Sequence, residues 1–243
     1  MASNNSDNNT AKKSKLILKC TNVSKVARGR QLLKDCSFSV YKGETVVVLA
    51  PEHNSKTTLA KIICGLVPPT SGEITIRGNK AGSRTNEYVS YQPEIPFVKN
   101  EHTISELMHL YNRFFKDFNF KRAFKLLKQF KIPPRTKFED LSVTAIQIVE
   151  TILVSSRKSS LYVFDDPLVH TDPKYRSALI EIMNNCKKNG AVVIFSQISH
   201  GLGKIADKAI ALKRGEIYIL LNSQDMGEEP NLTALCKEVF RNA

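Results

Sequence analysis

Short apolar runs and helical patterns alternate along most of the chain. The runs are rich in β-branched residues and close at glycines or carboxylates, as buried strands do. Strands that alternate with helices predict an α/β fold with a mostly parallel sheet. The expected strand regions are residues 15–23, 36–50, 72–78, 160–166 and 191–196, with a hairpin-like pair at 208–220.

Two helices are expected between these strands. The first begins near Lys56, directly after the apolar run TVVVLA, and closes at Gly65. The second covers residues 176–188 and is closed by the pair Asn189 and Gly190. Both helices follow strands, as the α/β pattern requires.

The middle third of the chain is helical in pattern. Residues 104–115 and 120–130 place apolar residues at helical spacing among lysines and arginines, and Pro133 and Pro134 follow. We therefore expect two amphipathic helices that form a small unit with its own core. The aromatic residues of this unit fit core packing better than an aromatic cofactor site. They are Phe114, Phe115, Phe118, Phe120, Phe124 and Phe130.

The length and composition suit a single compact domain, with 243 residues of which 42% are hydrophobic and 24% charged. Residues 1–15 are polar and rich in asparagine, so we expect a disordered tail and order from about Leu16 onward. No apolar run reaches the roughly 20 residues that span a bilayer, and the N-terminus lacks the apolar stretch of a signal peptide. A cytosolic or cytosol-facing protein is expected.

The charge is strongly basic. A formal net charge of +13 predicts attraction to nucleic acid, an anionic membrane leaflet or phosphorylated ligands, without choosing among them. The lysines are spread over the chain, as on a solvated surface. Five cysteines form no CxxC pair and have no histidines at metal-ligand spacing, so we expect neither disulfides nor a zinc site.

Polar chemistry follows a strand end, which is where open parallel sheets bind their ligands. Lys56, Thr57 and Thr58 open a helix directly after TVVVLA, which places an ammonium group, hydroxyls and backbone N–H groups around a potential phosphate. The strict phosphate-loop pattern fails, because Ala50 and Ser55 occupy its two glycine positions.

An ordered series of segments from about residue 16 onward resembles the ATP-binding subunit of ABC transporters. KTTLAKIICGLVPPTSGEITIRG resembles the region of the Walker A loop, YVSYQPE the Q-loop strand, and SLYVFDDP the Walker B strand. DLSVTAIQ stands at the signature position, HTDP at the D-loop, and IFSQISH at the switch-histidine strand. The resemblance implies a P-loop NTPase-type core with a mostly parallel sheet, an N-terminal antiparallel β subdomain and an inserted helical subdomain at about 100–158, all within residues 16–243.

The resemblance also implies ATP and Mg²⁺ as cofactors and assigns roles to three residues. Lys56 would contact the β- and γ-phosphates, Thr57 would ligate Mg²⁺, and Asp165 would hold that ion through water. These three positions match the family. The nucleotide would lie against Ala50, Glu52, His53, Asn54, Ser55, Lys56, Thr57 and Thr58.

The loop departs from the family pattern, since Ala50, His53 and Ser55 stand where the family has glycine. Forcing another residue into left-handed geometry costs about 1–2 kcal/mol per position, so we expect weak ATP binding or none. Glu52 adds a negative charge facing the phosphates.

The positions that the family uses for hydrolysis also differ. Asp166 replaces the general-base glutamate and is one methylene shorter, and a displacement near 1 Å can cost about 100-fold in rate. Glu94 replaces the Q-loop glutamine, and Ile198 replaces the switch histidine. His200 could substitute for that histidine, although a solvent-facing role is the simpler interpretation.

The segments that would contact a second subunit are altered as well. The signature keeps Ser142 but has Val143 and Thr144 in place of glycines, and a β-branched residue blocks close approach to the partner's nucleotide. Asp172 matches the D-loop. The residue expected to stack on adenine falls near Val26 or Ala27, and neither can stack.

Three functions are compatible with these patterns. The favoured one is a nucleotide-binding subunit with a degenerate site, on the cytosolic face of a membrane, which pairs with a second ABC domain and docks on a transmembrane subunit. The alternative is a functional but slow ATPase that energises transport. A nucleic-acid-binding ABC protein is the least favoured, because such relatives carry two ABC domains or a long coiled-coil insertion.

Overall fold

The structure is a computed structural model that describes residues 14–50, 53–96, 102–197, 201–222 and 232. Most of the tail expected at 1–15 lies outside these residues. The strands are β1 (Leu16–Ala27), β2 (Arg30–Tyr41), β3 (Thr45–Leu49), β4 (Ser71–Ile76), β5 (Asn79–Lys80), β6 (Val89–Gln92), β7 (Leu161–Asp165), β8 (Ala191–Ser196), β9 (Lys208–Lys213) and β10 (Glu216–Asn222). The α-helices are α1 (His53–Ile63), α2 (Ile104–Phe114), α3 (Phe120–Gln129), α4 (Val143–Ser155) and α5 (Pro173–Asn185).

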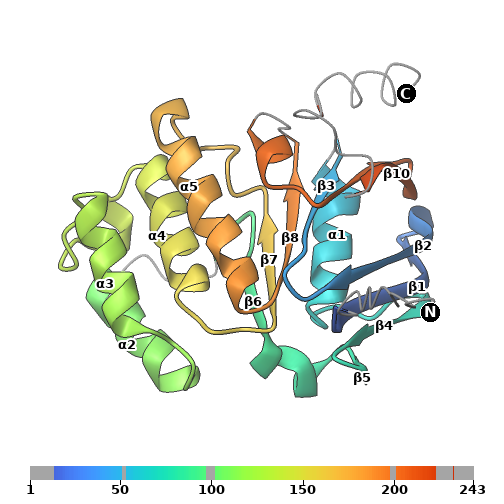
Figure 1. Ribbon diagram of the computed structural model, residues 1–243, viewed down its shortest axis with the longest axis horizontal. Coiled ribbons are helices and arrows are strands. Elements are labelled where there is room, and N and C mark those ends of the chain that lie inside the picture. Colours follow the sequence, from blue (N-terminus) through green and yellow to red (C-terminus); the bar gives the residue numbers. More distant parts are fainter. Residues whose placement is uncertain (1–13, 51–52, 97–101, 198–200, 223–231, 233–243) are drawn as a thin grey trace, which may run out of the picture.

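Two sheets organise the described chain (Figure 1). The larger has the order β10-β9-β3-β8-β7-β6 and is parallel except for β10, which runs antiparallel to β9. The smaller, β2-β1-β4-β5, is antiparallel. The expected α/β fold with a mostly parallel core and an N-terminal antiparallel sheet is confirmed.

Residues 36–50 serve both sheets. β2 ends at Tyr41, a turn follows in which Gly43 has a φ of 83°, and β3 begins at Thr45. Glycine adopts this left-handed backbone without steric cost, which lets the chain leave one sheet and enter the other. The apolar pattern predicted strand here but did not show this division.

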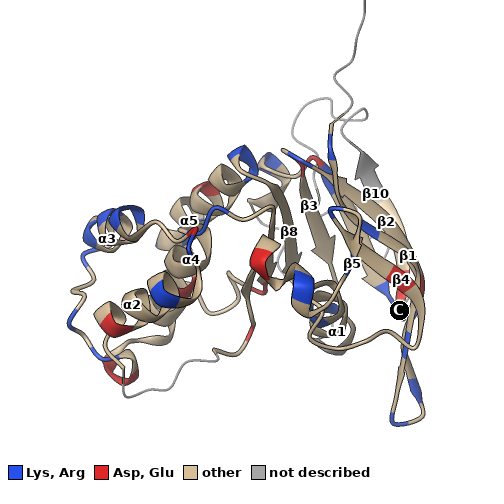
Figure 2. Ribbon diagram, turned by 90° about the horizontal axis from the view of Figure 1, so that it is seen from below, with Lys and Arg blue, Asp and Glu red and all other residues tan. Residues whose placement is uncertain are grey.

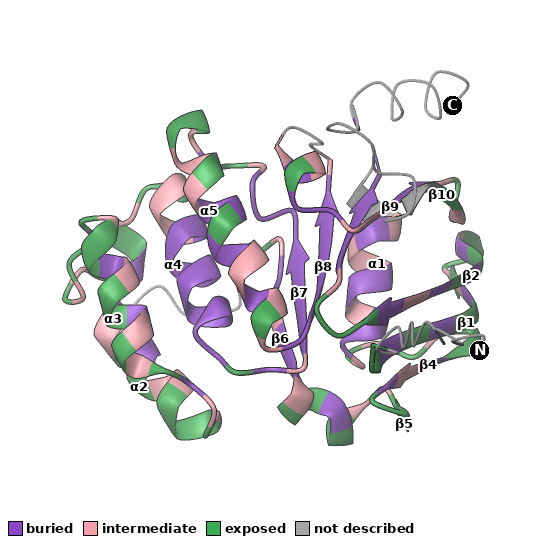
Figure 3. Cartoon of the chain, viewed as in Figure 1, coloured by how far each residue is buried: buried purple, intermediate pink, exposed green. Residues whose placement is uncertain are grey.

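The core lies on both faces of the parallel sheet, because alternate residues of a strand point to opposite sides. In β3, Val46 and Val48 belong to a cluster with α1 and the antiparallel sheet, whereas Val47 and Leu49 belong to the cluster of α2–α5. All five residues of β3 are buried, and Figure 3 shows the same for β7 and β8. A strand that is covered on both faces has apolar residues at successive positions. The sequence predicted these strands from such continuous apolar runs.

The helices α2, α3 and α4 form a unit on one side of the sheet (Figure 1). Thr103 caps α2 in a reciprocal pair with Glu106, and α3 ends before Pro133 as expected. The prediction of core packing is wrong for two of the six phenylalanines. Phe114 is 72% exposed and Phe124 is 50% exposed. Within the described part, no helix has the length and apolarity needed to cross a bilayer.

Candidate functional site

The carboxyl edge of the parallel sheet brings Lys56 and Asp166 together. Lys56 lies in the first turns of α1, which follows β3, and Asp166 directly follows β7. The Lys56 Nζ lies 2.5 Å from the Asp166 Oδ2, and both side chains are 0% exposed. The lysine expected to contact phosphate is therefore paired with the residue expected to act as general base.

Asp166 is held by further contacts. Its backbone is left-handed, with a φ of 48°, and its N–H donates to the Phe195 carbonyl at 2.9 Å. The Asp166 Oδ1 accepts from the Gln197 backbone N–H at 2.9 Å, and Oδ2 accepts from the Gln197 Nε2 at 3.3 Å. Sequence reasoning missed Gln197, although its place at the end of the buried strand β8 is the signal that could have found it.

A second group of oxygen atoms surrounds Asp165. The Thr57 hydroxyl donates to the Glu94 Oε2 at 3.3 Å, and the Tyr91 hydroxyl donates to the Asp165 Oδ2 at 3.3 Å. Burial raises the pKa of Asp165 to about 6; the nearby Thr57 hydroxyl opposes this rise, whereas the charges of Asp166 and Glu94 add to it. The structure thus brings Thr57, Glu94 and Asp165 together.

These oxygen donors suit a hard divalent cation. The Asp165 Oδ1 is buried and has no hydrogen-bond partner among the described residues. Buried polar atoms rarely lack a partner, so this oxygen suits the role of a cation ligand. Mg²⁺ takes one or two protein oxygens and completes its shell with water and phosphate. The residues fit such partial coordination but not a full protein cage, because no cluster of three or more metal-binding His, Cys, Asp or Glu side chains occurs in the described ranges.

The loop before α1 is only partly described. The Ala50 N–H donates to the Ser196 carbonyl at 3.2 Å, so this amide is engaged in the sheet. Ser55 is half-buried. Pro51, Glu52, Ile198 and His200 lie outside the described residues, as do the side chains of His53 and Asn54.

The signature and D-loop positions lie next to each other. Ser142 caps α4 by accepting from the Ala145 N–H at 3.3 Å, and Asp172 caps α5 by accepting from the Lys174 N–H at 3.0 Å. Thr144 joins the two segments: its hydroxyl donates to the His170 carbonyl at 2.9 Å and accepts from the Asp172 N–H at 3.1 Å.

The position expected to meet adenine is Val26 or Ala27, at the end of β1. Val26 is 42% exposed, and its N–H donates to the Thr70 Oγ1 at 3.0 Å. The structure contains no aromatic ring at either position, because the sequence supplies none.

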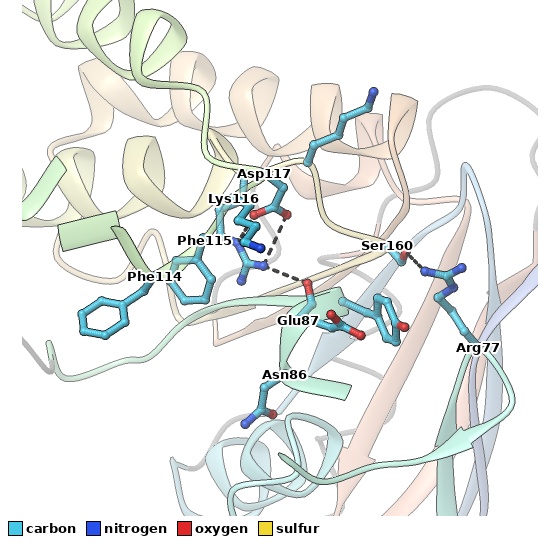
Figure 4. Close-up of a pocket in the computed structure, with 11 residues that line it drawn as sticks. Arg77, Asn86, Glu87, Phe114, Phe115, Lys116, Asp117 and Ser160 are labelled. Carbon is cyan, nitrogen blue, oxygen red and sulfur yellow. Dashed lines mark hydrogen bonds and ion pairs between the residues drawn. The ribbon is translucent and has the colours of Figure 1, made fainter. Parts of the chain in front are cut away.

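A hollow of about 600 Å³ lies at the opposite, amino-terminal edge of the sheet, where the helical unit meets the core (Figure 4). Figure 4 shows Phe114 and Arg77 on opposite sides of this hollow, with Lys116 and Asp117 between them. A neighbouring cavity of about 190 Å³ shares Arg157 and Phe115 with it. The resemblance implies that the helical subdomain and the Q-loop region contact the membrane subunit, and residues 114–117 and 157–158 of this hollow belong to that subdomain.

Arg157 anchors the hollow. Its Nε donates to the Asp117 Oδ1 at 3.1 Å, and its two Nη atoms donate to the Val89 and Glu87 carbonyls at 2.5 and 2.9 Å. Its guanidinium carbon also lies 3.7 Å from the centre of the Phe115 ring. One side chain thereby ties the α2–α3 connection to the start of β6.

Known proteins with this sequence pattern are ATP-binding subunits of transporters. A sequence profile described as ABC transporter matches residues 33–169. The ABC-type transporter ATP-binding protein EcsA of Bacillus subtilis is 30% identical over 195 residues, which cover 76% of this chain and 79% of EcsA. The phosphonates import ATP-binding protein PhnC of Hydrogenovibrio crunogenus is 28% identical over 222 residues, covering 83% and 81% of the two chains.

Solved structures agree. The ATP-binding subunit of an ABC transporter superposes with a TM-score of 0.80 at 25% identity, over 92% of this chain and 99% of that chain. The ATP-binding cassette MJ0796, solved as a dimer bound to ADP and Pi, has a TM-score of 0.74 at 20% identity, over 85% and 100% of the two chains, and shows the same fold. The profile match covers more than half of this chain, which therefore belongs to the ABC transporter family, among its ATP-binding subunits.

Proposed function

We propose that this chain is an ABC nucleotide-binding subunit with a degenerate site, which binds MgATP weakly or not at all, hydrolyses it poorly and serves as a structural or regulatory partner. The buried ion pair between Lys56 and Asp166 carries this proposal. Asp166 neutralises the charge of Lys56 inside the protein, and Lys56 is the position at which the family has its phosphate-contacting lysine.

Nucleotide binding competes with this pair. A phosphate that engages Lys56 leaves the Asp166 carboxylate buried without its cation, and breaking a buried pair in this way costs about 3–5 kcal/mol. Millimolar to micromolar affinity corresponds to only about 4–8 kcal/mol. Much of the binding free energy is thereby offset, in addition to the strain expected from the missing loop glycines.

Hydrolysis is disfavoured for a related reason. Both carboxylate oxygens of Asp166 already accept hydrogen bonds, from Lys56 and from Gln197. A general base must direct a lone pair at the attacking water at hydrogen-bond distance, and these contacts hold the carboxylate in another orientation and stabilise its charged form. Asp166 acts instead as a structural anion that fixes the ends of β7 and β8.

Calorimetric titration with MgATP tests the proposal. We expect a dissociation constant in the millimolar range or weaker, with Lys56→Ala differing little from the unaltered chain. Micromolar binding that disappears in Lys56→Ala would overturn the degenerate site and favour the alternative described next.

The alternative is a slow ATPase, favoured by one observation: Lys56, Thr57, Asp165 and Asp166 gather at the same strand ends. Phosphate release by the purified chain at millimolar ATP, abolished in Asp166→Asn, would support it. Absence of turnover under these conditions would exclude it for the isolated subunit.

We further propose that the chain pairs with a second ABC domain and docks on a transmembrane subunit, at the cytosolic face of a membrane. MJ0796 was solved as a dimer, and PhnC is named for import of phosphonates. The hollow and cavity joined at Arg157 offer a concave surface for the membrane subunit. Stoichiometric co-purification with a polytopic protein, lost on Phe115→Asp, would support this assembly, whereas a stable monomer without partners would contradict it.

A further inference from the structure

The exposed face of α3 combines basic and aromatic side chains in one stripe. Lys121, Phe124, Lys125 and Lys128 are spaced at i, i+3, i+4 and i+7, and all four are exposed. The opposite face buries Leu127 in the core of the helical unit. The stripe therefore has solvent on one side and a fixed helix behind it.

The charged residues around α3 are all basic. Residues 118–137 contain seven lysines and arginines and no aspartate or glutamate, in a chain of net charge +13. Figure 2 shows α3 as a nearly continuous basic helix at the outer end of the helical unit. The basic residues of the segment are Lys121, Arg122, Lys125, Lys128, Lys131, Arg135 and Lys137.

An apolar hollow of about 240 Å³ adjoins the stripe. It is lined by Phe124, Lys128, Lys131, Ile132, Pro133 and Pro134, so four of its six lining residues are apolar. A half-exposed phenylalanine beside an apolar hollow, ringed by lysines, costs hydration free energy unless another apolar surface covers it.

We propose that this face binds the surface of an anionic phospholipid leaflet, with the lysines at the headgroup phosphates and Phe124 among the upper acyl carbons. Basic amphipathic helices with an aromatic residue bind membranes in this orientation. Compact lysine charges on flexible stems suit a fluid headgroup layer, which requires no fixed bidentate geometry.

Nucleic acid fits the same face less well. Among the exposed residues of α3, only Gln129 carries a side-chain amide that could pair with a base edge, and the residues that line the hollow carry no side-chain amide or carboxylate. The lipid proposal depends neither on bound nucleotide nor on a membrane subunit, so it is independent of the function proposed above.

Vesicle co-sedimentation of the full chain tests the proposal. Phosphatidylcholine vesicles with and without phosphatidylglycerol are compared, and binding is expected only to the anionic vesicles and to weaken as salt rises. Each juxtamembrane lysine contributes about fivefold, so Lys125→Gln/Lys128→Gln lowers the partition coefficient by about 25-fold.

A matched control separates this face from net charge. Lys42→Gln/Lys80→Gln removes the same charge from two other exposed positions, one in the turn after β2 and one in β5. It is expected to leave vesicle binding within about twofold of the unaltered chain, because the antiparallel sheet and α3 lie at opposite ends of the molecule (Figure 1) and salt screens charges that are not at the lipid surface. If both double variants lost vesicle binding equally, the proposal that the α3 face is the binding site would be overturned.

The proposed insertion of Phe124 among the acyl carbons is tested separately. Phe124→Ser is expected to lower the partition coefficient at both low and high salt, whereas Phe114→Ser, which alters another exposed phenylalanine, leaves it unchanged. Equal binding to neutral vesicles, no effect of Phe124→Ser, or binding to RNA that Lys125→Gln/Lys128→Gln abolishes while vesicle binding persists would each overturn the proposal.

Discussion

Both edges of the parallel sheet bury an ion pair, and the two pairs are built differently. At the carboxyl edge, Lys56 and Asp166 are each 0% exposed and follow β3 and β7, two buried strands that lie on either side of β8. At the amino edge, the Arg157 side chain is 3% exposed and its partner Asp117 is 28% exposed. The second pair therefore keeps one side in contact with solvent.

The difference lies in how many bonds each cation makes. Arg157 donates to a carboxylate and two backbone carbonyls and also packs on Phe115, so its removal disconnects several segments. Within the part of the chain that the structure describes, Lys56 makes one hydrogen bond, to Asp166. The pair at the amino edge thus connects several segments, whereas the pair at the carboxyl edge neutralises a lysine that we propose is thereby withheld from phosphate.

The largest effect is expected at the amino edge. Arg157→Ala leaves Asp117 and two backbone carbonyls without their donor, which should lower the free energy of unfolding by about 3–5 kcal/mol. Urea unfolding monitored by circular dichroism measures this change.

Arg157→Lys serves as the control, since a lysine keeps the charge but cannot reproduce the forked geometry. It should recover less than half of the lost stability. Full recovery would mean that charge alone matters, and the contrast between the two edges would disappear.

The helical unit contains a buried carboxyl group for which no cationic partner is seen among the described residues, and it can be compared with the two ion pairs. Glu150 on α4 is 5% exposed, and its Oε2 has no hydrogen-bond partner among described residues. Burial raises the pKa of Glu150 from 4.5 to about 8. Because the folded pKa exceeds the unfolded one, the protein loses stability as pH rises from about 4.5 to about 8.

Glu150→Met removes this penalty. At pH 7 the variant should be more stable than the unaltered chain by about 3 kcal/mol, and the difference should vanish near pH 4.5. Thermal unfolding at several pH values measures it, with Glu150→Gln as a neutral polar control. A pH-independent difference would mean that packing, not ionisation, sets the cost.

At the carboxyl edge, the expected change concerns ligand binding. Asp166→Asn removes the charge that holds Lys56, so the lysine becomes available and MgATP affinity should rise by at least about tenfold, or about 1.4 kcal/mol or more. Calorimetry compares this variant with Lys56→Ala/Asp166→Asn, which should show no gain. A fall in affinity in Asp166→Asn would indicate that Asp166 itself contacts the ligand shell.

The sequence predicted the strands β3, β7 and β8 and the helices α2 and α3, because continuous apolar runs and helical spacing follow directly from burial. It also placed Lys56, Asp165 and Asp166 at strand ends. The contact between Lys56 and Asp166 joins positions 110 residues apart, and no local pattern encodes it. The same is true of Arg157, two of whose acceptors are backbone carbonyls and therefore carry no side-chain signal.

The smallest expected effect concerns the junction of the signature and D-loop segments. Thr144→Val keeps the shape of the side chain but removes the hydroxyl that links the His170 carbonyl to the Asp172 N–H. The loss should be about 1 kcal/mol in global stability, since two partly exposed backbone groups can turn to water. Hydrogen exchange should show faster exchange of the Asp172 amide, whereas Ser142→Ala should not affect that amide. Unchanged exchange in Thr144→Val would show that the two segments are held by packing alone, and that this part of the carboxyl edge owes its order to the helices α4 and α5.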